Sequence, residues 1–167
     1  MTVIHPLAPE FDERSKVLIL GTMPSPKSRE YGFYYSHPQN RFWRVLSDLY
    51  DARLPQNNDE KRALLHLSGI ALWDVLQSCE IEGASDGSIR DAVPNDVAGL
   101  LKETGIRRVF TTGGKAAALY KKLCLKDTGV EATALPSTSP ANCRLRYEDL
   151  LESYRVLLEF TGTHMYP

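Results

Sequence analysis

The sequence predicts an α/β fold in which helices cover both faces of a parallel sheet. Short apolar runs alternate along the chain with longer segments of helical periodicity, an alternation typical of parallel sheets. Several of the apolar runs break into loops rich in proline, serine and glycine, as expected where strands open toward a ligand. At 167 residues the chain is expected to form one domain, residues 1–167.

The first predicted strand is the apolar run 16–21. The next segment, 22–39, contains three prolines and is expected to be a long loop of the kind that often carries function. Helical spacing of apolar residues begins at Arg41, and Asn40 stands where an N-cap belongs. A second short helix is expected over 59–67.

The remainder of the chain continues the alternation, apart from residues 76–93, which are polar and show no clear period. The elements expected are a strand and turn over 69–75, a helix over 94–104, a strand over 107–112, a helix from Gly113 and Gly114 to Lys122, a strand over 131–135, and a helix over 145–160. The last helix has the clearest apolar stripe.

Composition excludes several classes of protein. The chain is 43% hydrophobic and 25% charged, it has no apolar stretch long enough for a membrane span, and its start does not resemble a signal peptide. We therefore expect an intracellular, cytoplasmic protein with no membrane association. The three cysteines are isolated and no helical histidine pair is present, so no metal site is predicted. Gly-Gly-Lys at 113–115 lacks the spacing of a phosphate-binding P-loop.

Charge is distributed unevenly along the chain. The formal net charge is −1, but residues 16–44 and 101–126 are locally basic, while acidic residues gather in 51–100 and 147–167. A protein that contacts phosphates with one face only would show such a pattern. Short hydroxyl side chains in proline-stiffened loops could add phosphate contacts, and the aromatic residues in 31–35 could stack on a base.

Two motifs about a hundred residues apart carry a family resemblance. The first reads V-L-I-L-G-T-M-P-S-P-K-S over 17–28 and continues as Y-Y-S-H-P-Q-N-R-F-W over 34–43; the second reads A-L-P-S-T-S-P-A-N over 134–142. With G-I-A-L-W-D-V between them, they resemble the hypoxanthine-DNA glycosylases (DNA-deoxyinosine glycosylases) of the uracil-DNA glycosylase superfamily. The first block is also similar to the mismatch-specific uracil-DNA glycosylases. The likeness extends from about residue 16 to 160.

The resemblance implies a three-layer α/β/α sandwich around a short four-stranded parallel sheet. It implies no cofactor, and a monofunctional enzyme that flips a deaminated base out of DNA and hydrolyses its bond to deoxyribose in base excision repair. Hypoxanthine is the base most expected, with uracil or xanthine possible. The protein would be a monomer, associated with the nucleoid through DNA.

The resemblance also assigns roles by position. Asn40 would be the catalytic residue. Base-binding residues would be Gly21, Thr22, Met23, Pro24, Tyr35 and His37, with Tyr35 stacking on the base. DNA-binding residues would be Ser25, Lys27, Ser28, Ser137, Thr138, Ser139, Pro140, Ala141, Asn142, Arg144 and Lys115.

One position departs from the family pattern. Many relatives carry Asp, Glu or Asn as the third residue of the first motif, where it positions the attacking water, whereas this chain has Met23. The substitution fits the hypoxanthine branch.

It also keeps open a weak or inactive damage-binding module on the same fold. The near-neutral net charge keeps open a small-molecule enzyme acting on nucleosides. Asp74, beside Trp73, is expected to cap the end of its strand, with tuning of a site as the alternative.

Overall fold

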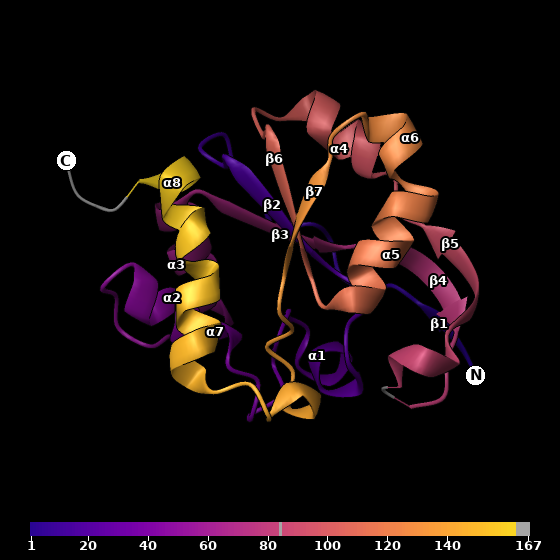
Figure 1. Cartoon of the computed structure of the whole chain (residues 1–167), viewed down its shortest axis with the longest axis horizontal. Helices are drawn as coiled ribbons and strands as arrows, with labels where there is room; N and C mark the ends of the chain where they lie inside the picture. The colour runs from indigo at the N-terminus through magenta and orange to yellow at the C-terminus, as the bar shows by residue number, and fades with distance from the viewer. Residues whose placement is uncertain (84, 163–167) are drawn as a thin grey trace.

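The computed structural model describes residues 1–83 and 85–162 (Figure 1). Its strands are β1 (Thr2–Ile4), β2 (Val17–Gly21), β3 (Ile70–Asp74), β4 (Leu76–Glu80), β5 (Arg90–Pro94), β6 (Arg108–Thr112) and β7 (Ala132–Leu135). Its α-helices are α1 (Pro26–Tyr31), α2 (Phe42–Leu49), α3 (Asn58–Ser68), α4 (Val97–Glu103), α5 (Gly114–Leu123), α6 (Leu125–Thr128), α7 (Tyr147–Tyr154) and α8 (Leu158–Thr161). Short 3₁₀ turns are η1 (Asp86–Ser88), η2 (Pro140–Asn142) and η3 (Arg155–Leu157).

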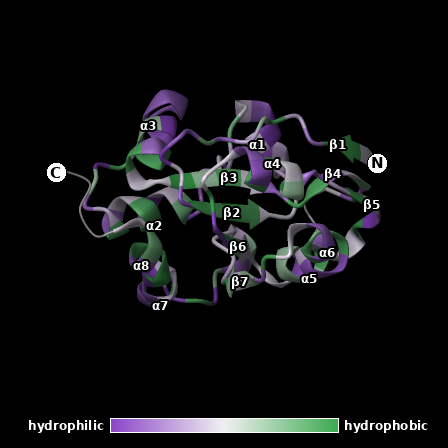
Figure 2. Cartoon of the chain, turned by 90° about the horizontal axis from the view of Figure 1, so that it is seen from above, coloured by the Kyte–Doolittle hydropathy of each residue, from purple (hydrophilic) through white to green (hydrophobic). Residues whose placement is uncertain are grey.

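The central sheet has the strand order β3-β2-β6-β7, and each neighbouring pair is parallel. Every residue of β2 is buried, and Figure 2 shows β2 and β3 as apolar ribbons in the middle of the molecule. Side chains of β2 alternate between two cores: Val17 and Ile19 belong to one, Leu18 and Leu20 to the other. The predicted three-layer sandwich around a four-stranded parallel sheet is therefore confirmed.

Helices close both cores, as the alternation of β2 requires. One core is formed with α2, α3 and α7, and the other with α4 and α5. Figure 1 shows the two groups of helices on opposite sides of the sheet. The strands all run in the same direction, so their carboxyl ends share one edge of the sheet, where the two motif loops emerge.

A second, antiparallel sheet of order β1-β4-β5 lies outside the sequence-based expectation. Strands β4 and β5 lie at the two ends of the segment 76–93, for which no element was predicted. Only Leu76 and Cys79 are buried in β4, and β5 has no buried residue, so neither strand carries a strong apolar pattern. Backbone pairing with neighbouring strands holds them instead.

Three further expectations need correction. The segment 22–39 contains a helix, α1, because Pro26 occupies its first turn and Ser25 accepts a hydrogen bond from the N–H of Ser28. The helix expected from residue 94 begins at Val97, since Pro94 ends β5 and Asp96 is the N-cap. The helix expected over 145–160 is interrupted by the 3₁₀ turn η3.

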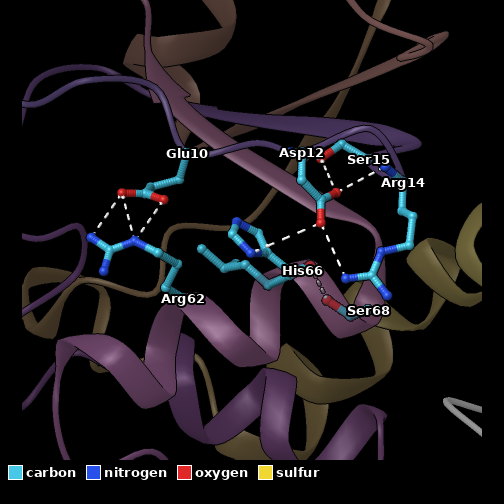
Figure 3. Close-up of polar contacts among 8 residues, drawn as sticks. Glu10, Asp12, Arg14, Ser15, Arg62, His66 and Ser68 are labelled. Atoms are coloured by element: carbon cyan, nitrogen blue, oxygen red, sulfur yellow. Dashed lines mark hydrogen bonds and ion pairs between the residues drawn. The ribbon is translucent and has the colours of Figure 1, made fainter.

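An N-terminal strap connects β1 to β2 and is fastened to α3 by charged side chains (Figure 3). The two carboxylate oxygens of Glu10 accept hydrogen bonds from Arg62 at 3.1–3.2 Å. Asp12 accepts from the backbone and guanidinium of Arg14 and lies 3.9 Å from His66. The strap is thereby held in one place along β3. In the part of the chain that the structure describes, no helix is long and apolar enough to cross a membrane.

Candidate active site

A pocket of about 980 Å³ opens at the carboxyl ends of the parallel strands. Gly21, Asp74, Thr112 and Leu135, the last residues of the four strands, all line it. Because β3 and β6 lie on either side of β2, the chain reverses its direction of travel across the sheet at this point, where α/β proteins bind ligands. Its volume is also that of a small-molecule site.

Most residues predicted for the site line this pocket. They are Gly21, Thr22, Met23, Pro24, Ser25, Ser28, Tyr35, His37, Asn40, Ser137, Thr138, Ser139, Pro140, Ala141 and Asn142. Lys27, Lys115 and Arg144 do not line it. Lys27 pairs with Glu30 at 3.3 Å on the surface of α1, and Lys115 is in the first turn of α5 beside the rim. The two motif loops thus meet, while all three of the predicted DNA-binding cations lie outside the pocket.

Two serines of the first loop have internal hydrogen-bond partners. The Ser25 hydroxyl caps α1, and the buried Ser28 hydroxyl accepts from the N–H of Ser36 at 3.1 Å. Both hydroxyls therefore stabilise the pocket wall, and their predicted contact with DNA stays a prediction.

Tyr35 forms an aromatic wall of the pocket. Its ring stacks on Phe42 with centroids 4.0 Å apart and planes at 16°, so only the opposite face is open to a base. The phenol lies 3.4 Å from the Thr112 hydroxyl. Burial raises the pKa of Tyr35, and the nearby Asp74 adds to the rise, so the phenol is a donor at neutral pH. Tyr35 has φ +54°, an uncommon backbone conformation for a tyrosine that the surrounding structure must hold.

Asn40 and His37 present hydrogen-bond donors from the end of the first loop. The Oδ1 atom of Asn40 accepts from the N–H of Phe42 at 2.9 Å, which fixes the side chain just before α2. The expectation that Asn40 is the N-cap was wrong, because α2 begins at Phe42 and its N-cap is Arg41. The amide N–H groups of Asn40 remain for the pocket. The Nδ1 atom of His37 accepts from the N–H of Gln39 at 3.1 Å, so the proton of the neutral ring is on Nε2.

Asp74 places a buried carboxyl in the pocket, although the sequence favoured a structural role over one in a site. The residue is 4% exposed, and its Oδ2 atom lies 2.7 Å from Nε2 of His5, whose side chain is 2% exposed. The Nδ1 atom of His5 accepts from the N–H of Leu7, so Nε2 carries the proton and donates to Asp74. The carboxylate is therefore held in one orientation by a fixed donor.

Gly21 gives the carboxylate room to face the pocket. Gly21 is paired with Asp74 across β2 and β3. A Cβ atom on Gly21 would lie 2.5 Å from Oδ1 of Asp74 and 3.4 Å from the Tyr35 hydroxyl. The absence of a side chain at this position allows Asp74 and Tyr35 to approach the same point of the pocket floor.

Asp86, on the turn η1 at the rim, is the other carboxyl that lines the pocket. The residue is exposed, but the surrounding protein partly desolvates its carboxyl and so raises the pKa of Asp86. The positive charge of Lys115 lowers this pKa, and the negative charge of Asp74 raises it further. Within residues 1–83 and 85–162, no group of three or more His, Cys, Asp or Glu side chains is placed to hold a metal ion.

The second loop is ordered by its own hydrogen bonds. Asn142 donates from Nδ2 to the carbonyl of Ser137, and the Ser139 hydroxyl accepts from the N–H of Ala141. Thr138 is buried, and its hydroxyl has no hydrogen-bond partner in the described structure. Tyr154 donates to the carbonyl of Pro136, which fixes the start of the loop. These bonds hold the second loop in place along the pocket.

Comparison with known families agrees with this geometry. The model of the uracil DNA glycosylase superfamily matches residues 8–158. The chain belongs to the uracil DNA glycosylase superfamily. The resemblance carried by the two motifs is thereby confirmed, and the matched range contains every strand of the parallel sheet.

Individual superfamily members are similar over most of their length. A hypoxanthine DNA glycosylase of Methanosarcina acetivorans is 37% identical over 134 residues, which is 80% of this chain and 84% of the relative. A hypoxanthine DNA glycosylase of Methanosarcina barkeri is 34% identical over 137 residues, 81% of this chain and 86% of the relative. A solution NMR structure from Methanosarcina acetivorans, of a protein provisionally described as a uracil DNA glycosylase, superposes with TM-score 0.78 and 31% identity, covering 94% of this chain and 99% of the other.

Sequence reasoning missed His5, gave little weight to Asp74 and overestimated the aromatic cluster 31–35. Asp74 could have been found as a carboxyl that ends a buried strand next to the first motif. His5 gave no signal, because it is far away in sequence and reaches the site through the unexpected antiparallel sheet. Of the aromatic cluster 31–35, Phe33 is core and Tyr31 is exposed, so these two do not serve as stacking surfaces in the pocket.

Proposed function

We propose that this protein is a DNA glycosylase that binds a flipped deaminated base, hypoxanthine first, and hydrolyses its N-glycosidic bond. The observation that supports this most directly is the buried Asp74 carboxylate in the pocket, with His5 as its fixed donor. A carboxylate accepts hydrogen bonds and donates none. The pocket therefore favours a base that presents an N–H group at this point.

Deamination creates such a group. Adenine has a lone pair at N1, and hypoxanthine has an N–H there beside the new carbonyl O6; cytosine and uracil differ in the same way at N3. In the proposed complex, Asp74 accepts from this N–H, and the Asn40 amide donates to the neighbouring carbonyl oxygen. Both residues line the pocket, and the Asn40 oxygen already has a backbone partner. The parent bases would place a lone pair against the carboxylate, which repels it.

The reaction follows from stabilising the departing base. Cleavage of an N-glycosidic bond develops positive charge on the sugar and negative charge on the base, as in other glycoside hydrolysis. Donors aimed at the carbonyl oxygen of the base stabilise the negative charge in the manner of an oxyanion hole. In the proposed complex Asn40 is one such donor, and Tyr35 holds the base by stacking on the ring face opposite Phe42.

DNA would approach along the rim formed by the two motif loops. Residues 137–142 carry hydroxyls and backbone N–H groups, and the start of α5 with Lys115 lies beside them. Such contacts tolerate any sequence and locate the damaged strand over the pocket. We further propose that one copy of the chain is sufficient for the reaction.

The test is single-turnover incubation with labelled duplexes that contain one hypoxanthine or one uracil, followed by alkali to cut abasic sites. We expect cleavage at hypoxanthine, and loss of at least tenfold in rate for Asn40→Ala. Asn57→Ala is the matched control, because the side-chain oxygen of Asn57 also accepts from a backbone N–H at the start of a helix, α3, and Asn57 is not part of the pocket lining. That variant should lose about 1 kcal/mol of stability and keep its rate.

Other outcomes would reject the proposal in distinct ways. Cleavage at uracil alone would change the substrate within the superfamily. Binding of the duplex by folded protein without cleavage would indicate a damage-binding module, and turnover of free deoxyinosine with no salt-sensitive DNA affinity would indicate a nucleoside enzyme.

A further inference from the structure

Arg41 follows directly after Asn40, and its side chain is directed to the second motif loop. The guanidinium donates from Nη1 to the carbonyl of Leu145 at 2.6 Å and from Nη2 to the carbonyl of Asn142 at 3.0 Å. The backbone N–H of Arg41 donates to the carbonyl of Thr138 at 3.1 Å. One residue of the first motif therefore makes two hydrogen bonds to the second motif, about a hundred residues away, and a third to Leu145 just beyond it.

These three bonds span the second loop. Thr138 precedes the turn η2, Asn142 is the last residue of that turn, and Leu145 lies just before α7. A planar guanidinium can bridge two carbonyls at a fixed spacing, which the single ammonium of a lysine cannot do. Because the two guanidinium nitrogens bond to carbonyls at two separate points after Thr138, the bridge fixes where the loop lies relative to Arg41.

From this arrangement we infer that Arg41 is a positioning residue, which fixes the DNA-facing loop 137–142 relative to Asn40. Both functional loops are then held by one rigid element, the start of α2, where Asn40 is itself bonded to Phe42. The interpretation differs from that suggested by charge alone, which would make Arg41 a phosphate ligand. Both of its terminal nitrogens already have protein acceptors.

The inference rests on the proposed function for its consequence in catalysis, but its structural content is independent. Displacing the loop would misplace the flipped nucleotide relative to Asn40, and misplacement by about 1 Å can reduce a rate by about a hundredfold. The loss should appear in the rate of base release within the bound complex. Affinity for undamaged duplex should change much less.

The experiment compares Arg41→Ala and Arg41→Lys with Arg44→Ala as the matched control. Arg44 is exposed one turn along the same helix, where its guanidinium stacks 3.7 Å above the ring centroid of Tyr147, so its removal deletes the same charge without releasing the loop. The first measurement is amide hydrogen exchange. We expect both Arg41 variants to lose protection at Asn142 and Leu145, whose amides donate within the loop, while Arg44→Ala keeps it.

The second measurement is single-turnover release of hypoxanthine. We expect a loss of at least tenfold for Arg41→Ala and little recovery in Arg41→Lys despite its retained charge. Guanidinium chloride at a few millimolar should restore part of the rate of Arg41→Ala and leave wild type and Arg44→Ala unchanged. If Arg41→Ala does not fold, the Arg41→Lys exchange and rate data decide the question.

The salt dependence of duplex binding separates the two possible roles. A phosphate ligand would reduce the slope of log affinity against log salt by about 0.9 when removed. That slope change, together with unchanged loop exchange, would overturn the positioning role. A wild-type protein that releases no base would refute the proposed function. The hydrogen-exchange result would still show whether Arg41 places the loop.

Discussion

His5 donates a hydrogen bond of 2.7 Å from Nε2 to Oδ2 of Asp74, although the two residues are 69 positions apart. Because Nδ1 of His5 accepts from the N–H of Leu7, the ring cannot turn its acceptor toward Asp74. The pair therefore makes the pocket floor a hydrogen-bond acceptor, because Asp74 can only accept and the donor of His5 is already used.

Replacing Asp74 with Asn should turn the pocket floor from a hydrogen-bond acceptor into a donor. The Asn oxygen must face the Nε2–H of His5, which leaves the amide N–H₂ toward the pocket, where it would oppose the N–H of hypoxanthine. We expect hypoxanthine release to fall by about 2 kcal/mol, or roughly thirtyfold, and discrimination against adenine to weaken. Single-turnover rates on matched duplexes measure both. An unchanged preference in a folded Asp74→Asn protein would remove Asp74 from base recognition.

Gly21→Ala should impair catalysis more than stability. The new methyl group would lie 2.5 Å from Oδ1 of Asp74, so the carboxylate must move away from the floor. We expect at least a tenfold loss of base release. Gly105→Ala is the control, since a Cβ at that position meets nothing within 4 Å. Equal rates for Gly21→Ala and wild type would show that this close approach is not needed.

Tyr35 allows stacking and hydrogen bonding to be separated. Tyr35→Phe keeps the ring on Phe42 and loses only the weak 3.4 Å contact with Thr112, so its rate should remain within about threefold of wild type. Tyr35→Ala removes the stacking surface and should cost about 1–3 kcal/mol in binding of the flipped base. Affinity for a duplex carrying a non-cleavable hypoxanthine analogue distinguishes them. Equal affinities for the two variants would argue against stacking on Tyr35.

Asp12 predicts a pH dependence of stability. Burial alone would raise the pKa of Asp12, but hydrogen bonds from Arg14 and the nearby His66 leave it below the ordinary value of 3.8. A lowered folded-state pKa means that this contribution to stability is present above pH 3.8 and is lost as pH falls through the lower folded value. Urea unfolding from pH 6 to 2 should show a smaller acid-induced loss for Asp12→Asn, by less than about 1 kcal/mol. Parallel pH curves for both proteins would contradict it.

The parallel sheet could be predicted from the sequence because its strands are buried on both faces and read as apolar runs. The same pattern could not reveal β5, which has no buried residue, or β4, which has only two. Backbone pairing specifies those strands, and pairing leaves little trace in residue type. Likewise, α1 was hidden because its single buried residue, Ser28, is polar.

The site was predicted as far as local motifs extend. Asn40, Tyr35 and the loop 137–142 are all in the pocket, since each lies within a continuous motif; their roles in the reaction remain predictions. His5, Asp74 and the bridging contacts of Arg41 depend on which strands and loops become neighbours. The charge of Arg41 was visible in the sequence, but its acceptors were not.

The antiparallel sheet has a practical consequence for how the protein is truncated. β1 pairs with β4, which begins just after Asp74, and this pairing places His5 behind the pocket. The superfamily match begins at residue 8. A chain trimmed to the matched range would keep both motif loops and the parallel sheet, yet its pocket carboxylate would have no buried donor. Expression designs that remove or displace the first seven residues would therefore remove the His5 hydrogen bond that orients Asp74 in the pocket.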